Sequence, residues 1–213
     1  MITRGRFLTL EGIEGAGKSS QLALIRRRLE QTGLRVVETR EPGGTGLGED
    51  IRSLLLGHRQ EGMAPDTELL LMFAARAEHL QRVILPALAA GAWVLCDRFT
   101  DASHAYQGGG RAIARERIRI LETWTQGDTR PDLTLLLDLP VDMGLARAGK
   151  RGPQDRFEME TQRFFERVRQ TYLDIAQEQP HRVKIIDASL SLPQVEAQIS
   201  AVMDTYLHDQ TRA

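Results

Sequence analysis

GIEGAGKS, residues 12–19, stands between an apolar run, Phe7 to Leu10, and a segment of helical period from Lys18 to about Thr32. Short apolar runs are typical of buried strands. The glycines allow the backbone to curl so that several N–H groups point at phosphate oxygens, and the helix start adds partial positive charge. The lysine is placed to reach the β and γ phosphates, and the hydroxyl of Ser19 to hold Mg²⁺. Residues 12–19 therefore predict a phosphate-binding loop; a turn that binds nothing would need strand, spacing, Lys-Ser pair and helix to agree by chance.

Strand-like and helical patterns alternate along the rest of the chain, which predicts an α/β fold with a doubly wound parallel sheet and helices on both faces. The expected strands are Phe7–Leu10, Arg35–Thr39, Trp93–Cys96, Leu133–Leu137 and Val183–Ile186. The expected helices are Lys18–Thr32, Gly48–Leu56, Asp66–Ala90, Ala114–Gln126, Val141–Ala148, Glu158–Gln177 and Pro193–Leu207. We see no repeat and no interdomain linker, so residues 1–213 are expected to form one domain.

Composition narrows the class of protein. With 28 Lys and Arg against 29 Asp and Glu, the net charge of −1 argues against a generally basic nucleic-acid surface. The single cysteine, Cys96, cannot form an intramolecular disulfide, and no N-terminal targeting segment is recognisable. Pro86 and Gly91 interrupt the longest weakly polar stretch, Val83–Cys96. We expect a cytoplasmic protein without a membrane span.

Charged residues follow the third expected strand, in Asp97-Arg98-Phe99. The carboxyl edge of a parallel sheet is where ligands bind in this fold class. Asp97 can support Mg²⁺ directly or through water, and Arg98 can clamp a phosphate. Taken alone, such a pair is more often a salt bridge, but its place beside a phosphate loop favours function.

Glu14 is unusual, because a carboxylate inside a phosphate-binding loop is repelled by a triphosphate. Its charge requires compensation. It could face the metal or accept a hydrogen bond from a sugar hydroxyl of a second substrate, or it could turn to solvent.

Phe73 and Arg76 lie three residues apart and hence on one helix face, where an aromatic plane and a donor fork could meet a nucleobase. The pattern alone favours a core position for Phe73, with Arg76 extending to water. Two glycine-rich stretches, Arg40–Thr45 and Tyr106–Arg111, follow strands. They suggest loops where backbone approaches a ligand, although ordinary turns use glycine as well.

The polar, basic segment Gly149–Arg156 lies between two helical patterns. Basic lids bring arginines over a transferring phosphoryl group and exclude water. We interpret residues 149–157 as a short lid, with a solvated loop as the alternative.

Taken together, these motifs resemble those of the thymidylate kinases, over nearly the whole chain and in family order. The motifs are Gly12–Ser19 with Glu14, Arg40–Gly44, Phe73–Arg76, Asp97–Phe99 and Ala105–Arg111. The resemblance implies a P-loop NTPase fold with a five-stranded parallel sheet, a homodimer, and Mg²⁺-dependent transfer of the ATP γ-phosphate to dTMP in dTTP biosynthesis. Gly15 stands where one branch of the family carries an arginine, so the chain resembles the bacterial branch that supplies its arginine from the lid.

The resemblance also implies roles for individual residues. Phe73 would stack on thymine, Arg76 would donate to its O4, Ser103 would meet N3, Arg98 would bind the acceptor phosphate, and Glu14 would lie near the 3′-hydroxyl. The implied dTMP contacts are Glu14, Glu41, Phe73, Arg76, Arg98, Ser103, Tyr106 and Gln107. The implied ATP contacts are Gly12, Ile13, Glu14, Gly15, Ala16, Gly17, Lys18, Ser19 and Ser20, with Ser19 and Asp97 at the metal. The implied catalytic residues are Lys18, Arg98, Glu14 and Arg151, with Arg147 and Arg156 as the next lid candidates.

Three other classes share a phosphate loop. A GTP switch protein needs Asn-Lys-x-Asp for guanine, and neither Lys150 nor Lys184 stands in that motif. A nucleoside kinase needs a general base, for which Glu14 is the only obvious candidate in the loop. A nucleic-acid-dependent ATPase needs a basic track, which the net charge disfavours.

Overall fold

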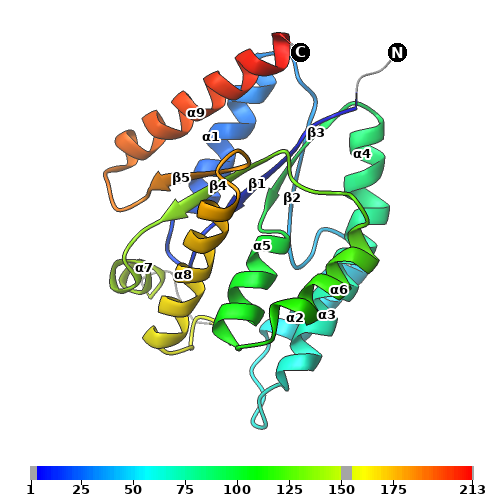
Figure 1. The fold of residues 1–213 in the computed structure, drawn as a ribbon, viewed down its shortest axis with the longest axis vertical. Helices are drawn as coiled ribbons and strands as arrows, with labels where there is room; N and C mark the ends of the chain where they lie inside the picture. Colours follow the sequence, from blue (N-terminus) through cyan, green and yellow to red (C-terminus); the bar gives the residue numbers. More distant parts are fainter. Residues whose placement is uncertain (1–3, 150–154, 213) are drawn as a thin grey trace.

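Five parallel strands lie at the centre of the molecule, in the order β2-β3-β1-β4-β5 (Figure 1). The computed structural model describes residues 4–149 and 155–212. The strands are β1 (Phe7–Glu11), β2 (Val36–Arg40), β3 (Trp93–Asp97), β4 (Leu133–Asp138) and β5 (Val183–Asp187). The expected α/β fold with a parallel sheet is confirmed. The chain passes from β1 outward to β2 and β3 and then crosses to β4, so a crevice forms at the carboxyl ends of β1 and β3.

Helices cover both faces of the sheet. In Figure 1, α1 (Lys18–Gln31) and α9 (Leu192–Arg212) lie on one face, and α5 (Thr100–Ser103) and α8 (Gln162–Glu178) lie on the other. The remaining helices are α2 (Gly46–Leu56), α3 (Pro65–His79), α4 (Leu85–Ala89), α6 (Arg115–Gln126) and α7 (Val141–Ala148). Within the described ranges, no helix is both long enough and apolar enough to cross a bilayer.

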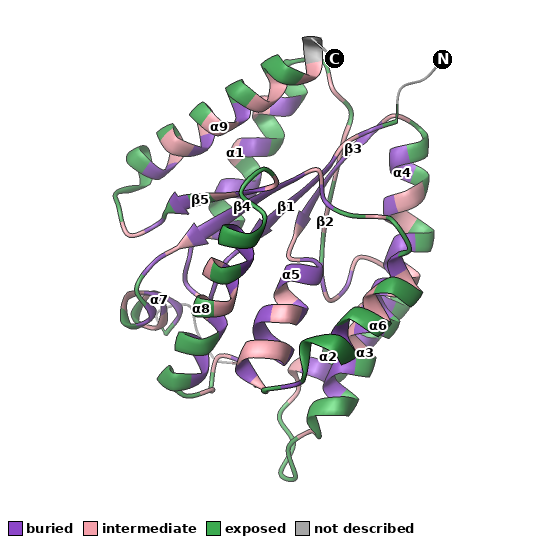
Figure 2. Ribbon diagram, in the orientation of Figure 1, coloured by how far each residue is buried: buried purple, intermediate pink, exposed green. Residues whose placement is uncertain are grey.

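The central strands are buried on both faces, as Figure 2 shows by their purple colour. Leu8 and Leu10 of β1 belong to the large core cluster that includes Ile25 of α1, whereas Phe7 packs with Leu80 and other residues of the opposite face. Successive strand residues point to opposite sides, so Glu11 lies on the same face as Phe7. A parallel sheet with covered faces requires this near-continuous apolar sequence.

The single helix expected over residues 66–90 is interrupted. A π-helical segment, η1 (Leu80–Ile84), joins α3 to α4. Pro86 follows two residues later and has no N–H to donate to the preceding turn. A π-turn accommodates such a break while the chain keeps its helical direction.

The glycine-rich stretch after Tyr106 is not a loop, contrary to expectation. It belongs to a second π-helical segment, η2 (His104–Gly110), which packs against α8. A Cβ atom on Gly109 would lie 2.2 Å from Thr171 Oγ1, and one on Gly110 would lie 2.4 Å from the Phe164 ring. The glycines therefore allow close approach of two helices.

Two helix starts differ from the sequence expectations. Helix α8 begins at Gln162 and not at Glu158, because Thr161 caps it by accepting a hydrogen bond from the Phe164 N–H. Helix α2 begins at Gly46, where Thr45 accepts from the Gly48 N–H at 2.9 Å. Both caps are the side-chain type that satisfies the free N–H groups of a first turn.

Candidate active site

The phosphate loop connects β1 directly to α1. Gly12, Gly15 and Gly17 have φ values of 139°, 74° and 90°. These are left-handed conformations that favour glycine, so the loop curls as expected. The Lys18 ammonium donates to the carbonyl oxygens of Gly12 and Ile13 at 3.1 and 3.2 Å. Burial and the neighbouring Arg98 guanidinium lower the pKa of Lys18.

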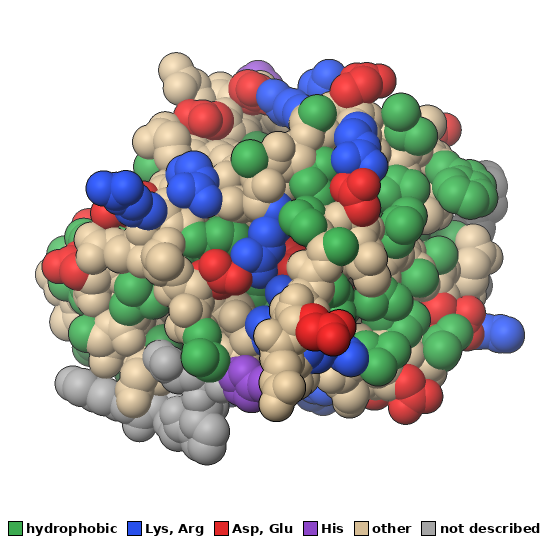
Figure 3. All heavy atoms as spheres, turned by 90° about the horizontal axis from the view of Figure 1, so that it is seen from below, with side chains coloured by type: hydrophobic (Ala, Val, Ile, Leu, Met, Phe, Trp, Pro, Cys, Tyr) green, Lys and Arg blue, Asp and Glu red, His purple; other side chains and the backbone are tan. Residues whose placement is uncertain are grey.

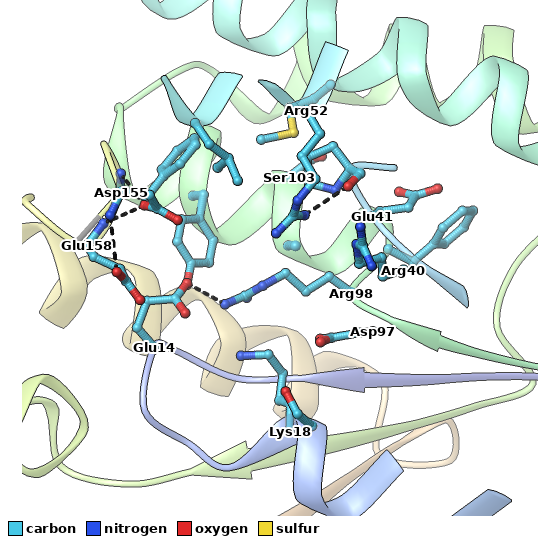
Figure 4. Close-up of a pocket in the computed structure, with 18 of the residues that line it drawn as sticks. Glu14, Lys18, Arg40, Glu41, Arg52, Asp97, Arg98, Ser103, Asp155 and Glu158 are labelled. Atoms are coloured by element: carbon cyan, nitrogen blue, oxygen red, sulfur yellow. Dashed lines mark hydrogen bonds and ion pairs between the residues drawn. The ribbon is translucent and has the colours of Figure 1, made fainter. Parts of the chain in front are cut away.

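A cavity of about 240 Å³ opens beside this loop (Figure 4). Twelve of the expected site residues line it: Glu14, Gly15, Gly17, Lys18, Ser19, Glu41, Arg76, Asp97, Arg98, Ser103, Tyr106 and Gln107. The other loop residues, Gly12, Ile13 and Ala16, are buried and do not line the cavity. Ser20 is exposed and does not line it either. Residues from five separate parts of the chain thus meet at one edge of the sheet.

Arg98 lies across the cavity and points toward Glu14 (Figure 4). Its Nη2 donates to Glu14 Oε1 at 2.6 Å, and the Tyr106 hydroxyl donates to the same oxygen at 3.1 Å. Burial disfavours the charge of Arg98, but nearby Tyr106 and Glu14 raise the pKa of its guanidinium well above the ordinary value. Arg98 therefore compensates the charge of Glu14 that the sequence left unexplained.

Asp97 lies between Arg98 and Lys18 in the same view (Figure 4). Its Oδ1 is buried and has no hydrogen-bond partner among the described residues. The hydroxyl-bearing Ser19 lines the same cavity. A buried carboxylate oxygen beside a hydroxyl suits Mg²⁺, which takes one or two protein oxygens and fills its other positions with water and phosphate oxygens. The donor set therefore fits the expected metal.

Arg76 is fixed by a buried network at the far wall of the cavity. Its Nε donates to Glu41 Oε2 at 2.7 Å, and its Nη2 donates to the Ser103 hydroxyl and the Phe99 carbonyl at 3.0 and 3.1 Å. His79 contacts the other oxygen of Glu41 at 3.0 Å. The Arg76 Nη1 is buried and has no partner within the described part of the chain. Arg76 is thus oriented with one hydrogen-bond donor left over.

Phe73 does not line the cavity: it occupies the core position that the sequence pattern alone favours, and not the position that the family resemblance implies. Its ring is 2% exposed and belongs to a core cluster with Leu69 and Ile118. The Arg76 guanidinium lies over the ring, 4.6 Å from its centroid. The preceding residue, Met72, lines the cavity instead. A helix advances about 100° per residue, so neighbouring side chains face different surroundings.

Two arginines that line the cavity were given no role from the sequence, although Arg40 begins one of the glycine-rich stretches expected near a ligand. Arg40, at the end of β2, pairs with Glu49 at 2.8 Å, and Arg52 of α2 donates to the Pro42 carbonyl at 2.9 Å. Arg52 lies one turn after Gly48 and one turn before Leu55, both buried. That inward position is the sequence signal that could have singled it out.

Viewed from below, the molecule mixes Lys and Arg with Asp and Glu across the middle of one face (Figure 3). Charges of both signs also meet in the cavity, where Lys18, Arg52 and Arg98 lie near Glu14 and Asp97.

The chain was compared with known proteins. The family model described as thymidylate kinase matches residues 10–199. A thymidylate kinase of Pseudomonas putida is 61% identical over 93% of this chain and 95% of its own length, and one of Nitrosomonas europaea is 54% identical over 97% and 95%. The crystal structure of thymidylate kinase from Ehrlichia chaffeensis superposes with a TM-score of 0.76 at 35% identity, covering 94% of this chain and 99% of that one.

The chain belongs to the thymidylate kinase family. Within this family member, the loop leaves no room for a side chain at position 15. A Cβ atom on Gly15 would lie 2.0 Å from the carbonyl oxygen of Gly144 in α7. The close approach of two backbone segments accounts for glycine here as much as its φ does.

The three arginines that were expected to serve a lid in this thymidylate kinase family member differ in their surroundings. Arg151 lies outside the described residues. Arg147 donates to the Ala188 carbonyl at 2.9 Å, and Arg156 pairs with the buried carboxylate of Glu68 at 2.7 Å. Neither Arg147 nor Arg156 lines the cavity. From the end of the expected lid and the residue that follows it, Asp155, Phe157 and Glu158 reach the cavity.

Proposed function

We propose that this chain transfers the γ-phosphoryl group of ATP to dTMP, giving dTDP and ADP, within the cavity beside the phosphate loop. Membership of the thymidylate kinase family supports the reaction. The observation that carries the assignment is a single cavity lined both by Lys18 of the loop and by Arg76 with its unused buried donor. A phosphoryl donor and a nucleobase can therefore be held in one enclosure.

The loop residues Gly12 to Ser20 are assigned to ATP. Backbone N–H groups and Lys18 would hold the phosphates, as the strand, loop and helix arrangement allows. Ser19 and Asp97 would hold Mg²⁺, which neutralises charge on the transferring phosphates when it is bound. Phosphate would displace the Gly12 and Ile13 carbonyls as the partner of the Lys18 ammonium.

Arg98 is assigned to the phosphate of dTMP and Glu14 to the sugar hydroxyl. The guanidinium has a fork geometry that suits a phosphate, and one of its nitrogens already binds an anionic oxygen of Glu14. Tyr106 stacks against Arg98, with the guanidinium carbon 4.8 Å from the ring centroid. Arg98, Glu14 and Tyr106 would thus act together at the acceptor.

Arg76 and Ser103 are assigned to the thymine base. Thymine presents an acceptor at O4, whereas cytosine presents an amino donor at the equivalent position. The unpartnered Arg76 Nη1 matches the first and opposes the second. Glu41 and Gln107 would support this wall, Glu41 by its ion pair with Arg76 and Gln107 by its 2.8 Å hydrogen bond to Glu68. Met72 would supply the apolar contact that the family resemblance assigned to Phe73.

Arg151 is assigned to the transition state, as in the branch of the family with a lid arginine. Gly15 cannot carry a side chain, and Arg147 and Arg156 are bonded elsewhere. Arg151→Ala should lower single-turnover phosphoryl transfer by at least about a hundredfold, with a modest change in dTMP affinity. Arg147→Ala is the matched control, and equal rates for both variants would contradict the assignment.

A homodimer is proposed from exposed apolar side chains on α3 and α6. Leu70, Ile120 and Trp124 are 56%, 58% and 81% exposed. A second copy of the chain would cover them. Sedimentation should give a dimer for the natural chain and a monomer for Trp124→Glu; both proteins keep Trp93.

The buried free Cys96 supports a cytoplasmic location, where thiols stay reduced.

The decisive experiment compares acceptors. We expect ADP release with ATP, Mg²⁺ and dTMP, and little with dCMP, dGMP or thymidine. Faster turnover of thymidine than of dTMP would instead indicate a nucleoside kinase.

A second measurement tests the base contact. Arg76→Ala should reduce the preference for dTMP over dCMP, but it also leaves Glu41 buried without its cation, which costs about 3–5 kcal/mol of stability. The double variant Arg76→Ala with Glu41→Gln should recover much of the stability and none of the preference. An unchanged preference would contradict the donor role.

A further inference from the structure

Glu11 is the last residue of β1 and immediately precedes the phosphate loop. It is completely buried, and it does not line the cavity. A carboxyl group in such a position is costly unless hydrogen bonds satisfy it. Its surroundings therefore indicate what it does.

Both oxygens of Glu11 are hydrogen-bonded, and both bonds lead to Arg98. Oε1 accepts from the backbone N–H of Phe99, the residue after Arg98, at 2.7 Å. Oε2 accepts from the Tyr172 hydroxyl at 2.7 Å. The Tyr172 oxygen accepts in turn from Arg98 Nη1 at 3.2 Å. Glu11 thus reaches the backbone on one side of Arg98 and, through Tyr172, its guanidinium.

Arg98 needs such support because its backbone is unusual. Its φ is 68°, a left-handed conformation that is uncommon outside glycine and persists where the surroundings determine it. The Arg98 N–H also donates to the Leu10 carbonyl at 2.9 Å. Contacts from β1 on both sides of this residue hold the turn that aims the guanidinium into the cavity.

We propose that Glu11 and Tyr172 are positioning residues for Arg98, which raise the affinity for dTMP without touching it. This rests on the proposed contact between Arg98 and the acceptor phosphate. A guanidinium held in its binding orientation before the substrate arrives loses less freedom on binding. Arg98 Nη1 also donates to the Gly12 carbonyl of the phosphate loop at 2.8 Å. Loss of the Tyr172 hydroxyl leaves that bond in place, so its effect should fall on the acceptor.

The test is Tyr172→Phe, which removes one oxygen and keeps the ring. Tyr206→Phe is the matched control, because Tyr206 of α9 packs against Trp93, away from the cavity. We expect the KM for dTMP to rise about threefold to tenfold in Tyr172→Phe, with the KM for ATP within about twofold of the natural chain. Glu11→Gln should likewise raise the KM for dTMP and leave the KM for ATP nearly unchanged. A residue that only supports the fold would not separate the two substrates.

Arg98→Ala completes a double-mutant cycle. This variant should raise the KM for dTMP more than about tenfold, and Tyr172→Phe should add nothing in its background. Equal effects of Tyr172→Phe in both backgrounds would show that Tyr172 does not act through Arg98. If Arg98→Ala raises the KM and Tyr172→Phe matches its control, the positioning role is wrong and the contact of Arg98 stands. If Arg98→Ala leaves the KM unchanged, the phosphate contact is wrong and the positioning proposal fails with it.

Discussion

The two sides of the cavity are built in different ways. The side assigned to ATP is a continuous segment, Gly12 to Ser19, whose backbone and single lysine surround the phosphate position. The opposite side is assembled from the end of β2, α3, the turn after β3 and η2. A continuous site is set by local conformation, whereas an assembled site exists only when distant elements are packed correctly.

The two sides also manage charge differently. The loop relies on backbone dipoles and Lys18, whose temporary partners are carbonyl oxygens of the loop. The assembled side relies on a preformed ion pair, Arg76 with Glu41, and a second pair, Arg98 with Glu14, joins it to the loop. Truncating one member of a buried pair leaves an uncompensated charge, so variants of this side should lose stability together with function.

Lys18→Ala should have the largest effect and test the continuous side alone. We expect turnover to fall about a thousandfold or more, because the ammonium stabilises charge that develops on the phosphates. The melting temperature should stay close to that of Lys184→Ala, a lysine of β5 outside the cavity. Near-normal turnover in Lys18→Ala would contradict the assignment of the loop.

Phe73→Ala and Met72→Ala test the assembled side. Phe73→Ala should cost about 3–5 kcal/mol of unfolding free energy, because its ring is buried beneath Arg76. Met72 is half-buried. Met72→Ala should therefore cost less unfolding free energy than Phe73→Ala while raising the KM for dTMP severalfold, which corresponds to about 1 kcal/mol of binding free energy. Urea unfolding and steady-state kinetics of the two variants supply the comparison. A larger KM effect for a stable Phe73→Ala would return that ring to the base site.

Gly15→Ala and Gly17→Ala separate backbone conformation from packing within the loop. Both residues have positive φ, but a Cβ atom on Gly17 would meet nothing within 4 Å, whereas one on Gly15 would meet the Gly144 oxygen. Gly15→Ala should therefore lower the free energy of unfolding, measured in urea, by about 2 kcal/mol more than Gly17→Ala does. Equal losses would mean that φ alone explains Gly15.

Glu11, buried at the end of β1 just before the phosphate loop, predicts that the stability of the protein depends on pH. Burial, and next Asp101, raise the pKa of Glu11 from 4.5 to about 8. The folded state then holds a proton that the unfolded state releases, so this contribution is complete below pH 4.5 and is lost as pH rises toward 8. Relative to Glu11→Gln, the natural chain should lose unfolding free energy steadily as pH rises through that window. Parallel pH profiles for the two proteins would contradict the shift.

The continuous parts of the molecule were predictable from the sequence. Apolar runs gave the five strands, because a buried parallel sheet requires them, and residues 12–19 showed the loop by spacing alone. The glycines at 108–110 misled the prediction, since glycine favours a turn and also permits the helix contact found between η2 and α8. Composition does not distinguish these two uses.

The assembled parts were less predictable. The pattern placed Phe73 in the core, where it lies, but it did not single out Met72, which the rotation of α3 within the packed structure turns to the cavity. The partner of Glu14 lies 84 residues away in the sequence. A helical period identifies the faces of α3 but not what covers each one.

The contact between Gly15 and Gly144 constrains how such an enzyme can change over generations. The obstructing atom is a carbonyl oxygen, so no replacement of the Gly144 side chain would make room at position 15. An arginine acquired at position 15 would require the α7 backbone at Gly144 to move. A single changed codon at position 15 would therefore be insufficient without a displaced helix.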